Sequence, residues 1–325
     1  MIVFEPQQIL TALILSFVML KFYFKLADRY NIIDKPNQRS SHTQITLRGA
    51  GIIFPVMFLL NTLNFLQEIN PYFLSGLLLI SIISFWDDVK ELSPTIRIVF
   101  QVISIVLLLW EIPMSLPFAF LFGFIILGVI NAYNFMDGIN GITVLYSSVA
   151  AASVLWVRHT LGIGNVWYDD SLFQLFAAFA AFAFFNLRKR AKCFSGDIGA
   201  ISMAFILCYG ILEVIINTSN PIYILLLGIY GLDSVATIVF RVFRREKLTQ
   251  AHRSHLYQYW ANEKGIPHVW VSMIYAAVQL CLSALVVYAE WYVALLVFGL
   301  LVFGYLIYRF KAEGIQNLLK REKTL

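Results

Sequence analysis

The sequence predicts an all-α integral membrane protein, a polytopic bundle of about eleven transmembrane helices that forms a single domain over residues 1–325. Composition is the first observation behind this prediction, because 60% of the residues are hydrophobic and only 13% are charged. In soluble domains about a quarter of the residues are charged. The second observation is a series of apolar runs of membrane-spanning length, and the third is the placement of basic residues in alternate loops. Lipid is therefore expected to cover much of the surface.

Eleven apolar runs are separated by polar residues, Pro or Gly, and a membrane span needs about 20 mostly apolar residues. We predict spans near residues 8–27, 49–66, 72–86, 96–111, 116–132, 142–161, 172–186, 198–216, 221–240, 267–289 and 291–309. The first run lacks the basic start of a signal peptide and is not followed by a small-residue cleavage site. We therefore expect this run to remain in the protein as a helix.

The basic residues predict the orientation of the bundle. With eleven crossings, one side of the membrane receives the loops 28–48, 87–95, 133–141, 187–197 and 241–266 and the tail 310–325. Together with the adjoining helix ends, these segments carry all of the 24 Lys and Arg residues except Arg158. Because cytosolic loops are enriched in Lys and Arg, this side is predicted to be cytosolic, with the N-terminus outside and the C-terminus in the cytosol. The net charge of +5 is thus explained without a nucleic-acid partner.

Carboxylates gather in the same loops. Asp87 and Asp88 end one apolar run, Asn134 and Asp137 lie in a loop rich in Asn and Gly, and Asp197 begins another run. Adjacent acids repel each other, and several converging carboxylates most naturally bind a hard divalent cation such as Mg²⁺. For each segment alone a plainer interpretation stays open: a solvated acidic helix end, a turn-rich loop, and an aspartate that caps its own helix.

Two further cytosolic segments combine basic residues with histidines and suit an anion. The candidate residues are His42, Thr46 and Arg48 in the first loop and His252, Arg253 and His255 in the loop 241–266. The second group could hold a pyrophosphate, although an exposed polar loop explains the spacing equally well. A zinc site is disfavoured, because neither a His-x-x-x-His pair nor a neighbouring Cys is present.

Asp233 falls inside the predicted span 221–240, where an ionisable group is costly and usually faces protein or a polar cavity. Together with the helix count, it makes a secondary transporter the main alternative from another functional class. Most other ionisable residues, however, lie at one face and not near the midplane, where transporters bind their substrates. A CDP-alcohol phosphotransferase is disfavoured because Asp137-Gly138 does not continue as Asp-Gly-x-x-Ala-Arg.

Taken in order, the motifs resemble those of the polyprenyl-phosphate N-acetylhexosamine-1-phosphate transferases, the WecA-like and MraY-like membrane enzymes of glycosyltransferase family 4. The resemblance rests on Asp87-Asp88, Asn134-x-x-Asp137-Gly138, Gly196-Asp197-x-Gly199 and the histidine loop. It implies a Mg²⁺-dependent enzyme, with Mn²⁺ as a substitute, in the bacterial plasma (inner) membrane. The enzyme would transfer a sugar 1-phosphate from a UDP-N-acetylhexosamine to undecaprenyl phosphate on the cytosolic face and release UMP. A homodimer is compatible with this resemblance.

The resemblance also implies roles for individual residues. Asp87, Asp88 and Asp137 would be catalytic, and Asp197 and Asp88 would bind the metal. Residues of the substrate-binding set would be Asn134, His42, Thr46, Arg48, His252, Arg253 and His255.

Two departures from the family pattern matter: the first removes a charge and with it an expected metal ligand, and the second affects the expected substrate. Asn140 stands where many members have Asp, and the sequence His252-Arg253-Ser254-His255 lacks adjacent histidines. The second departure is similar to members that start O-antigen synthesis with a deoxy sugar. The donor is therefore expected to carry GlcNAc or a deoxy analogue such as FucNAc or QuiNAc, and the product to initiate lipopolysaccharide O-antigen or another cell-surface polysaccharide.

Overall fold

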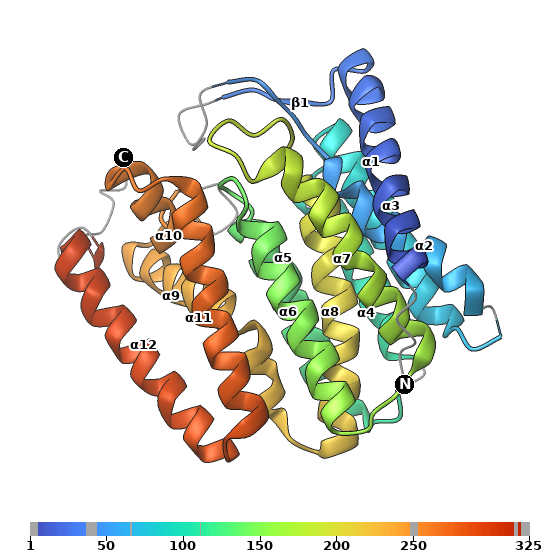
Figure 1. The fold of residues 1–325 in the computed structure, drawn as a ribbon. Helices are drawn as coiled ribbons and strands as arrows, with labels where there is room; N and C mark the ends of the chain where they lie inside the picture. The colour runs from blue at the N-terminus through green and yellow to red at the C-terminus, as the bar shows by residue number, and fades with distance from the viewer. Residues whose placement is uncertain are drawn as a thin grey trace.

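The computed structural model describes residues 6–36, 44–65, 67–110, 112–247, 253–314 and 318–319. These residues form a bundle of long helices that lie side by side, with one short strand pair at one end (Figure 1). The first half contains α1 (Pro6–Arg29), β1 (Ile33–Asp34), β2 (Thr46–Leu47), η1 (Ala50–Ile52), α2 (Ile53–Thr62), η2 (Leu63–Phe65), α3 (Pro71–Val89), α4 (Pro94–Leu109), α5 (Leu116–Met136) and α6 (Ile142–Thr160). The second half contains α7 (Val166–Asn186), α8 (Gly196–Thr218), η3 (Pro221–Leu227), α9 (Gly228–Arg244), α10 (Leu256–Gln258), η4 (Tyr259–Glu263), α11 (His268–Tyr288) and α12 (Trp291–Glu313).

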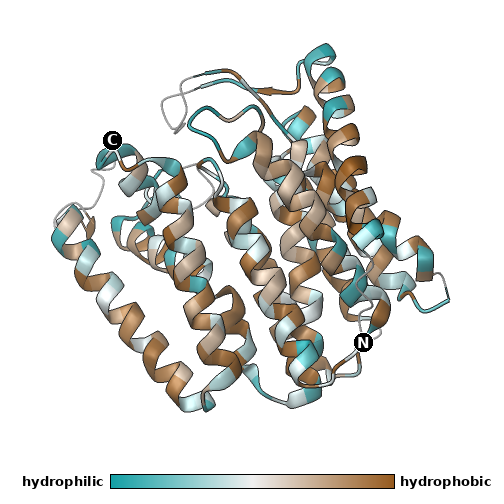
Figure 2. Ribbon diagram, in the orientation of Figure 1, coloured by the Kyte–Doolittle hydropathy of each residue, from teal (hydrophilic) through white to brown (hydrophobic). Residues whose placement is uncertain are grey.

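Among the described residues, every predicted span overlaps helical structure, and the all-α membrane bundle is confirmed. Within the described residues, seven helical segments are long and apolar enough to cross a membrane: α1, α3, α5, α8, η3 with α9, α11 and α12. Two more, Ala50–Phe65 and Pro94–Leu109, are apolar but shorter. The count of eleven crossings and the orientation of the termini stay predictions. Figure 2 shows hydrophobic residues along the helices and hydrophilic residues gathered toward their ends.

Local sequence signals explain where several helices begin. Asn70 and Ser93 each precede a Pro, and their side-chain oxygens accept hydrogen bonds from the N–H groups of Phe73 (2.8 Å) and Ile96 (3.4 Å). A polar side chain at the N-cap followed by Pro at the first helical position is favourable, because Pro has no N–H that would need a partner there. The helices α3 and α4 are therefore fixed at one end by their own sequence.

Helix α8 is the centre of the bundle. It packs against α2, α3, α5 and α6, and 94% of its most apolar stretch of 18 residues is buried. The corresponding stretches of α12 and α5 are only 11% and 17% buried. These two helices therefore expose apolar surface, as lipid-facing helices do. Because protein surrounds α8, the start of this helix is a rigid place from which to present a functional residue.

The loop that precedes α8 is tied to the loop between α1 and α2 by backbone hydrogen bonds. The N–H of Phe194 donates to the carbonyl of Leu47 (2.8 Å), and the N–H of Gly51 donates to the carbonyl of Ser195 (2.9 Å). Gly51 and Gly199 approach each other so closely that a Cβ on Gly51 would overlap the backbone of Gly199. Two segments nearly 150 residues apart in sequence are thereby held together at one end of the bundle.

Candidate active site

Asp88, at the end of α3, caps the beginning of α8. Its Oδ1 accepts a hydrogen bond from the N–H of Asp197 (2.9 Å), and its Oδ2 accepts one from the N–H of Ile198 (3.1 Å). The N–H groups of a first helical turn lack partners within the helix, and a carboxylate there also favours the helix dipole. The side chain of Ser195 at the N-cap position makes no such bond. The plainer interpretation of Asp197 as the cap of its own helix is therefore wrong, because Asp88 supplies the cap from another helix.

Arg48 joins two of the predicted aspartates. Its Nε donates to Asp88 Oδ1 (2.7 Å) and its Nη2 donates to Asp197 Oδ1 (2.8 Å), while the carbonyl of Arg48 accepts a bond from the Tyr23 hydroxyl (2.5 Å). Burial lowers the pKa of Arg48, but Asp197 and Asp88 raise it by more, so the guanidinium stays charged. A third of the Arg48 side chain is exposed, whereas that of Asp88 is fully buried. Arg48 can therefore reach a ligand that arrives from solvent.

Arg97 completes the cluster and was not predicted from the sequence. Its Nη1 lies 3.1 Å from Asp87 Oδ2 and 3.6 Å from Asp197 Oδ2. The other oxygen of Asp87 accepts a hydrogen bond from the N–H of Leu92 (2.6 Å). The only signal for Arg97 in the sequence is its place in the first turn of the helix after the Asp pair, where topology alone already accounts for a basic residue.

A cavity of about 10 Å³ lies between these side chains. Asp87, Arg97 and Asp197 line it together with Gln101 and the apolar residues around them. This volume corresponds to about one water molecule. The cluster therefore borders a small space that is lined by two carboxylates from different helices and otherwise largely by apolar side chains.

Asp137 lies in the loop between α5 and α6 and contacts the same loop before α8. The hydroxyl of Thr143 donates to its Oδ1 (2.5 Å) and the hydroxyl of Ser195 donates to its Oδ2 (2.5 Å). Burial raises the pKa of Asp137, and the hydrogen bonds from Ser195 and Thr143 oppose this rise. Neither hydroxyl was predicted, because Ser and Thr at loop ends are too common to single out.

The two asparagines of the same segment lie differently. The Asn134 backbone carbonyl accepts a bond from the N–H of Asp137 (3.3 Å), and its side chain is half-buried in the last turn of α5. Asn140 is buried, its amide donates to the carbonyl of Arg188 (2.8 Å), and its own carbonyl accepts a bond from Ser272 (2.9 Å). The Asn140 amide thus ties the loop between α5 and α6 to the loop before α8.

Two further predicted residues, Thr46 and Arg253, have their hydrogen-bond partners outside the aspartates. Thr46 is in β2 and its hydroxyl donates to the carbonyl of Gln44 (3.1 Å). The Nη2 of Arg253 lies 2.7 Å from Glu263 in a polar surface region. His42 and His252 lie outside the described residues.

His255 is buried, and the structure places it in another polar cluster. Its Nδ1 lies 3.4 Å from Asp233 Oδ1. Asp233 itself is buried and accepts hydrogen bonds from the hydroxyls of Tyr275 (2.6 Å) and Tyr305 (2.9 Å). The carboxylate that suggested a transporter is thus enclosed by protein donors.

The structure therefore brings together five of the predicted residues, Arg48, Asp87, Asp88, Asp137 and Asp197, and adds Arg97 to them. We call this group the aspartate cluster. Its formal charge is negative, since four carboxylates face two guanidinium groups, and such a site suits a ligand that combines phosphate oxygens with a cation. Among the described residues, no three His, Cys, Asp or Glu side chains are arranged to hold a metal ion by themselves.

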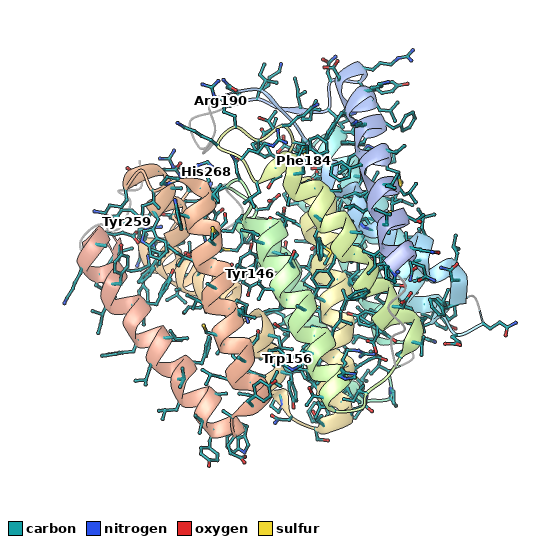
Figure 3. All side chains as sticks on the ribbon, viewed as in Figure 1. Tyr146, Trp156, Phe184, Arg190, Tyr259 and His268 are labelled. Atoms are coloured by element: carbon teal, nitrogen blue, oxygen red, sulfur yellow. The ribbon has the colours of Figure 1, made fainter. Side chains whose placement is uncertain are left out.

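Several polar segments lie at the end of the bundle that carries the loop before α8. Figure 3 shows Arg190, His268 and Tyr259 at this end and Trp156 toward the opposite end. The loop before α8, which contributes to the aspartate cluster, also carries Arg190. The cluster thus lies on the face that the basic residues mark as cytosolic in the predicted topology.

Comparison with known proteins finds one family and several named relatives. Residues 70–215, which span α3 to α8, match the model of Glycosyl transferase family 4. The chain is 23% identical over 271 residues (77% of this chain, 74% of the relative) to the probable undecaprenyl-phosphate N-acetylglucosaminyl 1-phosphate transferase of Bacillus subtilis (strain 168). It is 24% identical over 272 residues (74% of this chain, 72% of the relative) to the undecaprenyl-phosphate alpha-N-acetylglucosaminyl 1-phosphate transferase of Escherichia coli (strain K12). A phospho-N-acetylmuramoyl-pentapeptide-transferase of Desulforamulus reducens is 26% identical over 177 residues (50% and 49%).

Proposed function

Because this chain belongs to glycosyl transferase family 4, we propose that it transfers an N-acetylhexosamine 1-phosphate from a UDP-sugar to undecaprenyl phosphate and releases UMP. The observation that carries the proposal is the aspartate cluster itself. Its carboxylates come from α3, from the loop after α5 and from the start of α8, and two arginines from other segments join them. The two guanidinium groups can pair with phosphate oxygens, and the carboxylates beside them can share a cation with those oxygens.

The location of the cluster suits both substrates. Undecaprenyl phosphate presents its phosphate at the headgroup level of the membrane, whereas the nucleotide donor arrives from water. A site at the ends of membrane helices meets both. In the predicted topology this end faces the cytosol, and the enzyme is proposed to act on the cytosolic side of the bacterial plasma membrane.

The proposed reaction is a displacement at phosphorus. An oxygen of undecaprenyl phosphate attacks the phosphorus that carries the sugar, a new P–O bond forms, and the bond to UMP breaks, so that UMP leaves with the electron pair. Arg48 and Arg97 are placed to bind the phosphate oxygens and to balance their charge, as guanidinium groups commonly do. Asp87 and Asp137 are proposed to orient the attacking phosphate: Asp87 borders the small cavity, and Asp137 accepts hydrogen bonds from two side-chain hydroxyls, which can rotate. Asp88, by contrast, is held by two backbone N–H groups of α8.

We propose that Mg²⁺, or Mn²⁺ in its place, binds between Asp87 and Asp197. The fit rests on the donor set, since both carboxylates border the cavity of about 10 Å³ and Mg²⁺ is commonly held by one or two carboxylates plus substrate phosphates. When bound, the ion would neutralise the diphosphate and the departing UMP. Arg97 now contacts both carboxylates and would share them with the cation.

The identity of the donor sugar is also a proposal. The named relatives from Bacillus subtilis and Escherichia coli are N-acetylglucosaminyl 1-phosphate transferases. The histidine loop of this chain, in contrast, resembles that of enzymes for deoxy sugars such as FucNAc or QuiNAc. We therefore propose UDP-GlcNAc or one of these deoxy analogues as the donor, and the start of O-antigen or another cell-surface polysaccharide as the role.

The purified protein is expected to release UMP when it receives undecaprenyl phosphate, Mg²⁺ and one donor from a panel of UDP-GlcNAc, UDP-QuiNAc and UDP-FucNAc. UMP and the lipid product would be measured by chromatography, and omission of the lipid phosphate is the control. Lack of UMP with every donor would contradict the transferase function. Uptake of an intact UDP-sugar into proteoliposomes without UMP would instead favour the transporter alternative.

The pH dependence of this activity should report on Asp137. Thr143→Val keeps the shape of the side chain but removes a donor that stabilises the carboxylate, so the pKa of Asp137 should rise further. If the carboxylate form is active, the acid limb of the kcat/KM profile moves to higher pH in this variant. Thr143→Ser keeps the hydroxyl and should leave the limb in place. An identical profile in wild type and Thr143→Val would remove Asp137 from the ionisation that controls activity.

A further inference from the structure

The carboxylate of Asp233 is the centre of a second polar cluster. It is 1% exposed, and donors reach it from three other elements. Tyr275 lies on α11 and Tyr305 on α12, while His255 immediately precedes α10. The guanidinium of Arg309, also on α12, lies 4.0 Å from the same carboxylate. Such a complete shell of donors explains why a charged group is tolerated within α9.

The backbone of α10 is attached to the same carboxylate. The N–H of Leu256 donates to Asp233 Oδ1 (3.0 Å), and the N–H of Tyr257 donates to its Oδ2 (3.4 Å). Arg309 donates from Nη2 to the carbonyl of Ser254 (2.8 Å), two residues earlier. Asp233 and Arg309 therefore hold the start of α10 from two sides.

Tyr257 connects α10 with the loop of the aspartate cluster. Its hydroxyl donates to the carbonyl of Phe135 (2.9 Å) in the last turn of α5. A Cβ on Gly138 would overlap the Tyr257 hydroxyl, so the ring packs directly on the backbone at that glycine. Asp137 lies between these two contact points in the sequence. The position of the Tyr257 ring thus limits where the turn that carries Asp137 can lie.

We propose that Asp233 is a positioning residue of the transferase site, which acts by holding Tyr257 against the turn Phe135–Gly138. The catalytic consequence rests on the proposed function, whereas the mechanical connection does not. The connection also gives α12 a part in the site, because Tyr305 and Arg309 support Asp233 from that helix. Helix α12 lies mostly on the outside of the bundle and would otherwise have no evident link to the chemistry.

The first test compares the kinetics of two buried carboxylate variants. Asp233→Asn should lower kcat by about 10- to 100-fold, the scale expected when a catalytic group is displaced by a fraction of an ångström to an ångström. The matched control is Asp169→Asn, since Asp169 is buried and paired with Arg158 (2.5 Å) on the other face of the predicted topology. Both variants should lower the melting temperature, but only Asp233→Asn should lower kcat. Equal losses of kcat in the two variants would mean that Asp233 has a general structural role.

A double-variant cycle then asks whether Asp233 acts through Tyr257. Tyr257→Phe removes only the hydroxyl that contacts Phe135, and it should lower kcat with little change in melting temperature. The double variant Asp233→Asn/Tyr257→Phe should be no slower than the slower single variant, because both changes break one connection. Fully multiplicative losses would overturn the proposed route.

Hydrogen exchange separates this inference from the proposed function. In Asp233→Asn, amide exchange should become faster at Leu256 and Tyr257 and in the segment 135–138, whereas Asp169→Asn should leave these amides protected. Unchanged exchange at these sites in Asp233→Asn would overturn the inference. If exchange changes as expected while the wild-type protein releases no UMP with any donor, the positioning contact stands and the transferase function falls.

Discussion

The Asp197→Asn variant is expected to lose nearly all transfer, with kcat lower by on the order of 10²- to 10³-fold, as when one charge-stabilising group is removed from an active site. Asp197 contacts both Arg48 and Arg97 and borders the small cavity with Asp87. An amide of the same shape removes its negative charge, so the two guanidinium groups lose their shared partner. The proposed cation loses one of its two protein ligands at the same time.

Stability should separate this effect from a folding defect. In Asp197→Asn, Arg48 keeps Asp88 and Arg97 keeps Asp87, so the melting temperature should change little. UMP release and thermal unfolding would be measured on the same preparation, with Asp169→Asn as the control for loss of a paired carboxylate at the other face. Wild-type turnover in Asp197→Asn would exclude Asp197 from the site.

The second large effect is expected for Gly196→Ala. Gly196 has φ +70° at the start of α8, and a Cβ on this residue would overlap the Asp88 carboxylate. Backbone strain in the left-handed region costs about 1–2 kcal/mol for a residue other than Gly. The collision would also push Asp88 from the N–H groups of Asp197 and Ile198. We expect at least a tenfold loss of kcat, since small displacements of catalytic groups have effects of about this size or larger.

Gly162→Ala is the matched control for this prediction. Gly162 has φ +66°, almost the same backbone strain, but a Cβ there would meet no atom within 4 Å. Both variants should therefore lose a similar amount of unfolding free energy from strain, and Gly196→Ala should lose more because of the overlap. Only Gly196→Ala should lose activity, and normal activity in that variant would show that the Asp88 cap is dispensable for transfer.

The cap gives the two adjacent aspartates different tasks. The side chain of Asp88 is fully buried, and its oxygens accept hydrogen bonds from α8 and Arg48. Asp87, in contrast, borders the cavity. In the sequence the two are indistinguishable neighbours on one helix end. Their side chains diverge because successive residues of an α-helix point in directions about 100° apart, so that one faces α8 and the other α4.

The loop before α2 contributes Arg48 to the aspartate cluster although the family match begins only at residue 70. Arg48 reaches the cluster because the strand pair and the backbone bonds to Phe194 and Ser195 hold this loop beside α8. A variant of Arg48 should therefore affect phosphate binding as directly as a variant within the matched region.

The sequence by itself determined the membrane class, the helical ranges and the face that carries the polar loops. These properties depend on local composition, because an apolar run of sufficient length must become a helix in lipid, where each backbone polar group needs a partner within the segment. Five residues of the aspartate cluster could also be named, because they stand in short polar motifs beside these apolar runs, namely Arg48, Asp87, Asp88, Asp137 and Asp197.

Only the tertiary structure decided how these residues are used. Asp88 as the cap of α8, Arg97 as a partner of two carboxylates, and His255 in the separate Asp233 cluster all depend on contacts between segments far apart in the chain. A sequence motif shows which chemical groups are present, but it does not show which residue each group will contact in the folded protein. That choice is made when the helices pack, since a buried charge is stable only where packing brings it a partner.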